Sequence, residues 1–117
     1  MGYYTYHTLH VKNVRPDEEE KLVEAMDNLD IIGYALEDSI FRYDDDEIEF
    51  GCENEVKWYS HDEDMMKLSK LFPHMIFKLH GEGEERGDIW DSYYQNGVVE
   101  ICQAEIVIPK PTKIPWD

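Results

Sequence analysis

The stretch "GDIWDSYYQNGVVEICQAEIVIP", residues 87–109, decides the fold class, because it has the pattern of a β-hairpin. Two runs of alternating apolar and polar residues flank Asn96-Gly97, the pair that best suits a type I′ turn. The proline-rich residues 110–117 that follow are expected to form an extended tail without helix or strand. Ile114 and Trp116 are the side chains that could dock this tail on the body.

The first third of the chain predicts a strand and then a helix. Residues 3–12 are rich in Tyr, Thr and Val and have no purely polar face, which favours a central strand or one covered on both sides. A helix is expected to begin at Pro16, with acidic residues in its first turn. Its apolar stripe consists of Leu22, Val23, Met26 and Leu29.

The middle of the chain predicts a loop, two short strands and a second helix. Residues 36–46 have a loop-like composition with a weak edge element at 40–43, and alternation favours strands at 48–50 and 55–59. Ser60 and Glu63 have the spacing of a capping box for a helix that Pro73 ends, with an apolar stripe of Met65, Leu68 and Leu71 or Phe72. Residues 74–80 alternate again as a strand.

These elements predict a single α+β domain over residues 1–109, followed by the tail. The expected order is strand, helix, strand, helix and three strands. One antiparallel-rich sheet with both helices on one face buries every apolar stripe. A ferredoxin-like (split βαβ) arrangement with a C-terminal β-hairpin is the expected topology.

Two segments carry a resemblance to known proteins. "EVKWYSHDEDMMKLSKLFP" followed by "FKLHGEGEERGDIWDSYYQNG" resembles a domain of small phage and mobile-element proteins of unknown function, over roughly residues 47–107. The resemblance implies a ferredoxin-like domain and a phage or mobile-element setting. It implies no catalytic residues.

Composition limits the classes of partner. The formal net charge of -16 repels nucleic acid and anionic lipid, so no direct nucleic-acid binding and no membrane association are expected. Cys52 and Cys102 lie in or beside apparent strands and are expected to be buried free thiols, which fits a reducing compartment. With no signal peptide pattern in "MGYYTYHTLHV", a cytoplasmic location in a bacterial host cell is expected.

Three kinds of site are disfavoured by the residues present. The glycines of "GEGEERG", residues 81–87, follow a strand as a phosphate-binding loop would, but Glu82, Glu84 and Glu85 oppose phosphate and a strand follows. No carboxylate run has calcium-loop spacing, no cysteine pair has zinc spacing, and no cofactor is expected. No nucleophile motif accompanies the histidines, although His74 and His80 share one face of a strand.

The remaining pattern, acidic clusters beside aromatic residues, indicates an interaction protein. The hypothesis is a small acidic phage-type protein that binds and inhibits a host protein with a basic, nucleic-acid-binding surface, as an anti-CRISPR or anti-restriction DNA mimic would. The alternatives are a small enzyme or ligand-binding domain that uses a His/carboxylate face, and a structural homo-oligomer such as a homodimer. The expected partner-binding residues are Asp44, Asp45, Asp46, Glu47, Glu49, Glu82, Glu84, Glu85, Tyr43 and Tyr59.

Overall fold

A computed structural model describes residues 4–32, 36–52, 56, 58, 60–85, 87–105 and 107–115, without the side chains of 37–40, 43 and 52. The elements follow the order β1 (Thr5–Lys12), α1 (Glu19–Asn28), β2 (Leu36–Asp44), β3 (Glu47–Cys52), α2 (His61–Leu71), β4 (Ile76–Gly83), β5 (Ile89–Gln95) and β6 (Val98–Gln103). This confirms the α+β class.

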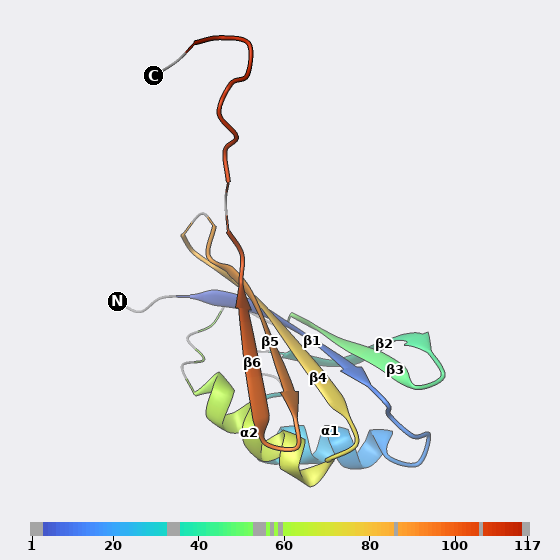
Figure 1. Cartoon of the computed structure of the whole chain (residues 1–117). Helices are drawn as coiled ribbons and strands as arrows, with labels where there is room; N and C mark the ends of the chain where they lie inside the picture. The colour runs from blue at the N-terminus through green and yellow to red at the C-terminus, as the bar shows by residue number, and fades with distance from the viewer. Residues whose placement is uncertain are drawn as a thin grey trace.

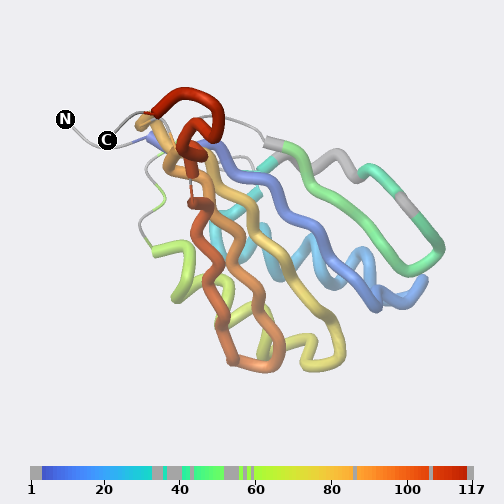
Figure 2. Tube along the Cα trace, turned by 45° about the horizontal axis from the view of Figure 1, so that its top comes forward, coloured from blue at the N-terminus to red at the C-terminus, as the bar shows by residue number. Residues whose placement is uncertain are grey.

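The strands form one antiparallel sheet in the order β2-β3-β1-β4-β5-β6. Both helices lie on the same face of this sheet (Figures 1 and 2). β1 is central, as its composition predicted, and pairs with β3 and β4. Of the two predicted alternatives the central position holds, since no helix of the described residues lies over the opposite face.

The core lies between the sheet and the helices. β1 contributes Leu9 and Val11, and β4 contributes Phe77 and Leu79, none of them accessible to solvent. The other fully buried large side chains are Tyr94, Phe50, Leu22, Met26, Ile31, Leu36, Ile48, Met65, Leu68 and Met75. The predicted stripes of both helices are thus confirmed at their central positions.

The C-terminal hairpin agrees with the prediction. Asn96 and Gly97 have φ angles of 46° and 78°, as a type I′ turn requires, and β5 and β6 pair from Gln95–Val98 to Trp90–Gln103. The Gly97 N–H donates to Ser69 Oγ at 2.9 Å, which joins the turn to α2. Beyond β6, the described part of residues 104–115 has no helix or strand and runs away from the sheet (Figure 1).

Several local predictions are wrong. The edge element expected at 40–43 is part of a longer edge strand, β2, which replaces the expected loop over 36–44. Pro16 lies in a turn before α1, where the Glu18 N–H donates to the Arg15 carbonyl. Of the strand expected at 55–59, Val56 forms an isolated bridge with Thr5, and residues 55, 57 and 59 lie outside the described residues. Ser60 is the N-cap of α2 without a side-chain cap bond, because its hydroxyl donates to Asp64 instead.

Two predictions about side chains near the C-terminus are also wrong. Cys102 is exposed, because it points to the helix-free face of the edge strand β6. Ile114 is 67 % exposed and does not dock the tail. The side chain of Cys52 and all of Trp116 lie outside the described residues.

Candidate functional site

The predicted carboxylates fall into groups at opposite ends of the sheet. Asp45 and Asp46 form the β2–β3 turn, beside the Lys12 end of β1, whereas Glu82 belongs to β4 at the Thr5 end. The length of β1 separates the two ends by roughly 23 Å at about 3.3 Å per residue. The structure therefore does not bring the predicted residues together in one patch.

The β2–β3 turn presents an exposed carboxylate cluster on a fixed backbone. Asp44, Asp45 and Asp46 are all exposed, and within the described residues none of them forms an ion pair. The Asp45 N–H donates to Asp44 Oδ1 at 3.0 Å, and the Val14 N–H donates to the Asp46 carbonyl at 3.0 Å. We call these three residues the acidic tip.

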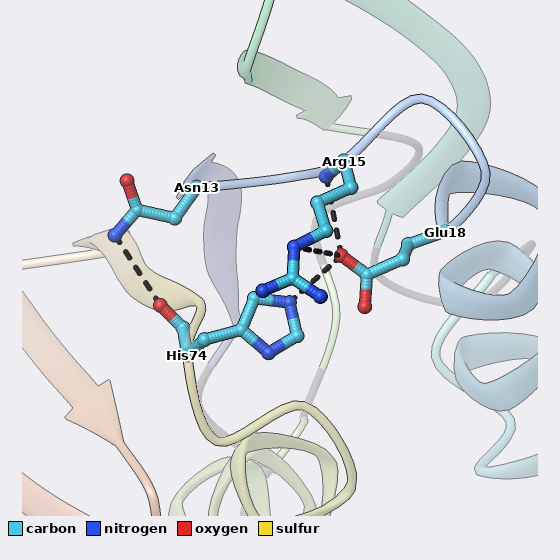
Figure 3. A network of polar contacts seen from close by, with 4 residues as sticks. All are labelled: Asn13, Arg15, Glu18 and His74. Atoms are coloured by element: carbon cyan, nitrogen blue, oxygen red, sulfur yellow. Dashed lines mark hydrogen bonds and ion pairs between the residues drawn. The ribbon is translucent and has the colours of Figure 1, made fainter.

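A hollow of about 430 Å³ lies beside the acidic tip, lined by Asn13, Val14, Arg15, Pro16, Asp45, Asp46 and His74. Figure 3 shows the polar contacts that three of these residues, Asn13, Arg15 and His74, make with Glu18 or with each other. Glu18 accepts a hydrogen bond from the Arg15 N–H at 3.2 Å and lies 2.7 Å from His74 Nε2, and Asn13 donates to the His74 carbonyl at 3.2 Å. These bonds hold the chain segments next to the acidic tip in place, so the tip carboxylates lie on a rigid part of the surface.

The carboxylates on the helix-free face of the sheet are partly neutralised. Glu47 lies 3.3 Å from His10 Nε2 and 4.0 Å from Lys12 Nζ. Glu49 is half-buried and is the register partner of His10. Lys78 and His80 lie beside them in a further shallow hollow. This face carries charges of both signs and is a poor imitation of a phosphate track.

The "GEGEERG" stretch has a structural role that the sequence analysis missed. Gly81 and Gly83 belong to β4, and no helix follows. A Cβ on Gly81 would lie 2.2 Å from the ring of Trp90, so the glycine makes room for that indole. Gly87 alone of these glycines has a positive φ, of 85°. Glu84 and Glu85 are exposed in the turn that follows β4.

The His/carboxylate face contains paired histidines rather than a free base. His80 Nδ1 lies 2.7 Å from Asp91 Oδ1, and its Nε2 lies 3.2 Å from Glu82 Oε1. Burial acts to lower the pKa of His80, but the hydrogen bonds and charges of Asp91 and Glu82 outweigh it and raise that pKa. An imidazole with both nitrogens occupied by carboxylates is poorly placed to accept a proton from a substrate.

His74 and His80 do not share a strand face, contrary to the prediction. β4 begins only at Ile76, and His74 lies in the turn after α2, where it contacts Glu18.

Two of the predicted partner-binding groups, the Tyr43 side chain and all of Tyr59, lie outside the described residues.

Sequence reasoning also missed a cluster of two histidines and two tryptophans on the helix-covered face of the sheet. His7 is 1 % exposed and lies edge-on to Trp58 with ring centroids 5.1 Å apart, and none of the described residues forms a hydrogen bond with its Nδ1. His61 stacks on Trp90 at 4.8 Å. Burial and the nearby His61 lower the pKa of His7 to about 4, so His7 is neutral at physiological pH. The placement of His7 in line with Leu9 and Val11 was the available signal.

Comparison of the chain with protein-family models, with curated proteins and with solved structures gave no match. Within the described residues, no helix is long and apolar enough to cross a membrane. The described residues also contain no group of three or more His, Cys, Asp or Glu side chains arranged to hold a metal ion.

Proposed function

We propose that this protein is a small acidic interaction protein that binds a basic, nucleic-acid-binding surface of another protein and blocks it. The observation that carries the proposal is the acidic tip, three adjacent exposed carboxylates that form no ion pair with any described residue and stand on a braced turn. The acidic tip offers negative charge to a basic surface that normally binds phosphates. Within the part of the chain that the structure describes, no cationic side chain has to be displaced first. The net charge of -16 adds long-range attraction to such a surface.

The exposed glutamates at the opposite end of the sheet, Glu84 and Glu85, would supply a second contact point. The two ends lie roughly 23 Å apart along β1, about the length of seven base pairs at 3.4 Å each. The mixed-charge face between them carries Tyr6 and Tyr93, which are 49 % and 36 % exposed and suit an interface. In this proposal, therefore, the two ends of the sheet imitate the phosphates of DNA, and the face between them does not.

The finer topology belongs to the same proposal. β1, α1, β2, β3, α2 and β4 would form a ferredoxin-like unit, to which the β5–β6 hairpin is added at the β4 edge. Its support is the connectivity: α1 links β1 to β2 with β3 between them, and α2 links β3 to β4 with β1 between them. A phage or mobile-element origin and action in the bacterial cytoplasm as an anti-CRISPR or anti-restriction protein complete the proposal.

A capture experiment tests the function. The probe is the heparin-binding protein fraction of a bacterial lysate, which is enriched in basic nucleic-acid-binding proteins. The immobilised protein should retain specific nucleic-acid-binding proteins at about 0.05 M salt and release them at about 0.5 M salt or on addition of duplex DNA. Retention that duplex DNA does not reverse would overturn the mimicry.

Two variants with equal loss of charge make the test specific for the acidic tip. The combined Asp44→Asn, Asp45→Asn and Asp46→Asn substitutions should weaken retention by about tenfold or more, roughly 1.4 kcal/mol. The control removes three exposed carboxylates of α1 by Glu20→Gln, Glu24→Gln and Asp27→Asn. If both variants lose binding equally, net charge alone explains it and the tip is not the site.

A further inference from the structure

The two edges of the sheet differ in regularity. β2 forms one edge, and its pairing with β3 is interrupted by register shifts between Leu36 and Ile40 and between Arg42 and Asp44. β6 forms the other edge and pairs with β5 without a shift over its whole length. Proteins commonly blunt free edges with bulges, lysines or prolines. β2 is blunted in this way, whereas β6 has neither lysine nor proline and carries Val98 and Ile101, which are 69 % and 56 % exposed.

The turn geometry determines which backbone groups of β6 point outward. In a two-residue hairpin, the residues that flank the turn form a hydrogen-bonded pair, here Gln95 and Val98. Alternation then directs the N–H and C=O groups of Val99, Ile101 and Gln103 away from β5. Within the described part of the chain, no backbone hydrogen bond reaches these groups from that side. The edge therefore offers six polar groups in a regular row.

We propose that β6 pairs antiparallel with β6 of a second copy of this chain, around a twofold axis at Ile101. In an antiparallel pair, residues that lie opposite each other point to the same face of the sheet. A twofold axis perpendicular to the sheet preserves this only if it passes midway between two copies of the same residue. An axis at Ile101 puts two apolar side chains opposite each other and joins the outward groups in hydrogen-bonded pairs. An axis at Glu100 would oppose two carboxylates and would leave the outward groups of Gln103 beside the partner's turn, without a strand residue to pair with.

The C-terminal tail supports a second copy as the occupant. In the antiparallel pair, Ala104 of each chain passes Val98 of the other, so each tail enters the region of the other chain's β5–β6 turn. A hollow of about 500 Å³ lies there, lined among others by Pro73, Ile76, Tyr93, Val98 and Glu100. An extended proline-rich segment suits an aromatic-lined groove of this kind.

The tail has the chemistry that this hollow requires. Val107 and Ile108 are 77 % and 85 % exposed, so the described part of the chain leaves most of their apolar surface uncovered. Lys110 and Lys113 would bring positive charge close to a body with a large negative charge. Figure 1 shows the tail directed away from its own sheet, as it would be when it reaches a neighbour.

The effect of salt on association distinguishes the dimer proposal from the proposed function. Two chains of charge -16 repel each other, and salt screens this repulsion, so added salt should favour the dimer. Binding to a basic partner should respond to salt in the opposite direction. Either proposal can therefore fail without the other.

Sedimentation equilibrium of the full chain tests the dimer. The expected mass is twice 13.9 kDa at micromolar concentration, with the dimer fraction rising between about 0.05 and 0.5 M salt. Ile101→Lys places two cations at the axis and should give a monomer, whereas the control Ile89→Lys, on the helix-free face of β5, should remain dimeric. A wild-type monomer under all conditions, or a dimeric Ile101→Lys variant, would overturn the proposal.

A cross-link tests the register. Glu100 lies opposite the partner's Cys102 in a non-hydrogen-bonded pair, where Cα atoms are about 4.5 Å apart and a disulfide is feasible. Glu100→Cys should therefore give an oxidised dimer, in which mass spectrometry identifies a link between the introduced thiol and the native Cys102. The Glu100→Ser control and the wild type should cross-link far more slowly, because two Cys102 residues lie on a diagonal of about 7–8 Å. A predominant link between two Cys102 residues would show that the register is wrong.

Discussion

Trp58, together with Val56, attaches the segment after β3 to the core. It is 6 % exposed, its Nε1 donates to Asp64 Oδ2 at 2.8 Å, and its ring contacts His7. Trp58→Ala should lower the free energy of unfolding by about 3–5 kcal/mol, because it removes a large buried ring. Urea denaturation measures this loss.

Glu84→Ala is the control for the Trp58 prediction. Glu84 is exposed in an acidic turn, so its removal should change stability by less than about 0.5 kcal/mol. Glu82 is a poorer control, because it also lies 3.2 Å from His80 Nε2. An unchanged urea midpoint for Trp58→Ala would mean that the indole is exposed and that the cluster around His7 does not form.

The same residue shows what the sequence could and could not predict of the site. The alternation that predicts a strand at 55–59 places Trp58 and Val56 on its apolar face, and both side chains are buried. Two neighbours of Trp58, His7 and His61, come from β1 and α2, and Trp90, which contacts both histidines, comes from β5. No local pattern records that these elements meet. The acidic tip was predicted from composition, but its distance from Glu84 follows only from the sheet order.

At the scale of secondary-structure elements, predictions succeeded where local chemistry decides the conformation. The Asn96-Gly97 pair fixes its own turn, and the stripes of α1 and α2 define their buried faces. β2 was predicted only as a weak edge element at 40–43, because its pairing with β3 stabilises a longer strand that lacks a continuous apolar pattern. The capping box failed because Asp64 competed successfully for the Ser60 hydroxyl.

The pairing of β4 with β5 gives a prediction at this scale. Gly81 lies opposite Trp90, and a Cβ at Gly81 would lie 2.2 Å from the indole. Gly81→Ala should therefore cost about 1–3 kcal/mol of unfolding free energy through overpacking. In a Trp90→Ala background the same substitution should cost little, and the double-mutant cycle measures the difference. Equal costs in both backgrounds would locate the strain elsewhere.

At the scale of the whole molecule, a charge of -16 couples stability to pH through many groups at once. Protonating carboxylates relieves mutual repulsion as pH falls, which stabilises the folded chain. His80 changes stability in a defined direction, because its pKa is raised in the folded state. Its contribution is present below its ordinary pKa and is lost as pH rises through the raised value.

At acid pH, His7 changes the stability of the fold in the opposite direction. Its pKa falls from 6.5 to about 4 on folding, so between these values the unfolded chain binds a proton that the folded chain does not. The stability contributed by neutral His7 is complete above pH 6.5 and is lost as pH falls towards 4. The loss should reach about 2–3 kcal/mol at about pH 4.5, at 1.36 kcal/mol for each pKa unit.

A comparison with His7→Leu isolates this contribution from the carboxylates, which both proteins share. The difference in unfolding free energy between wild type and His7→Leu should shift by about 2–3 kcal/mol against the wild type between about pH 7 and pH 4.5. His80→Gln is the matched control, since its difference from wild type should change as pH rises above about 6.5 and with the opposite sign. Urea denaturation at each pH gives both differences. Parallel pH profiles for wild type and His7→Leu would show that His7 titrates at its ordinary pKa. The imidazole would then have to be open to water, and the packing of His7 against Trp58 and His61 would be wrong.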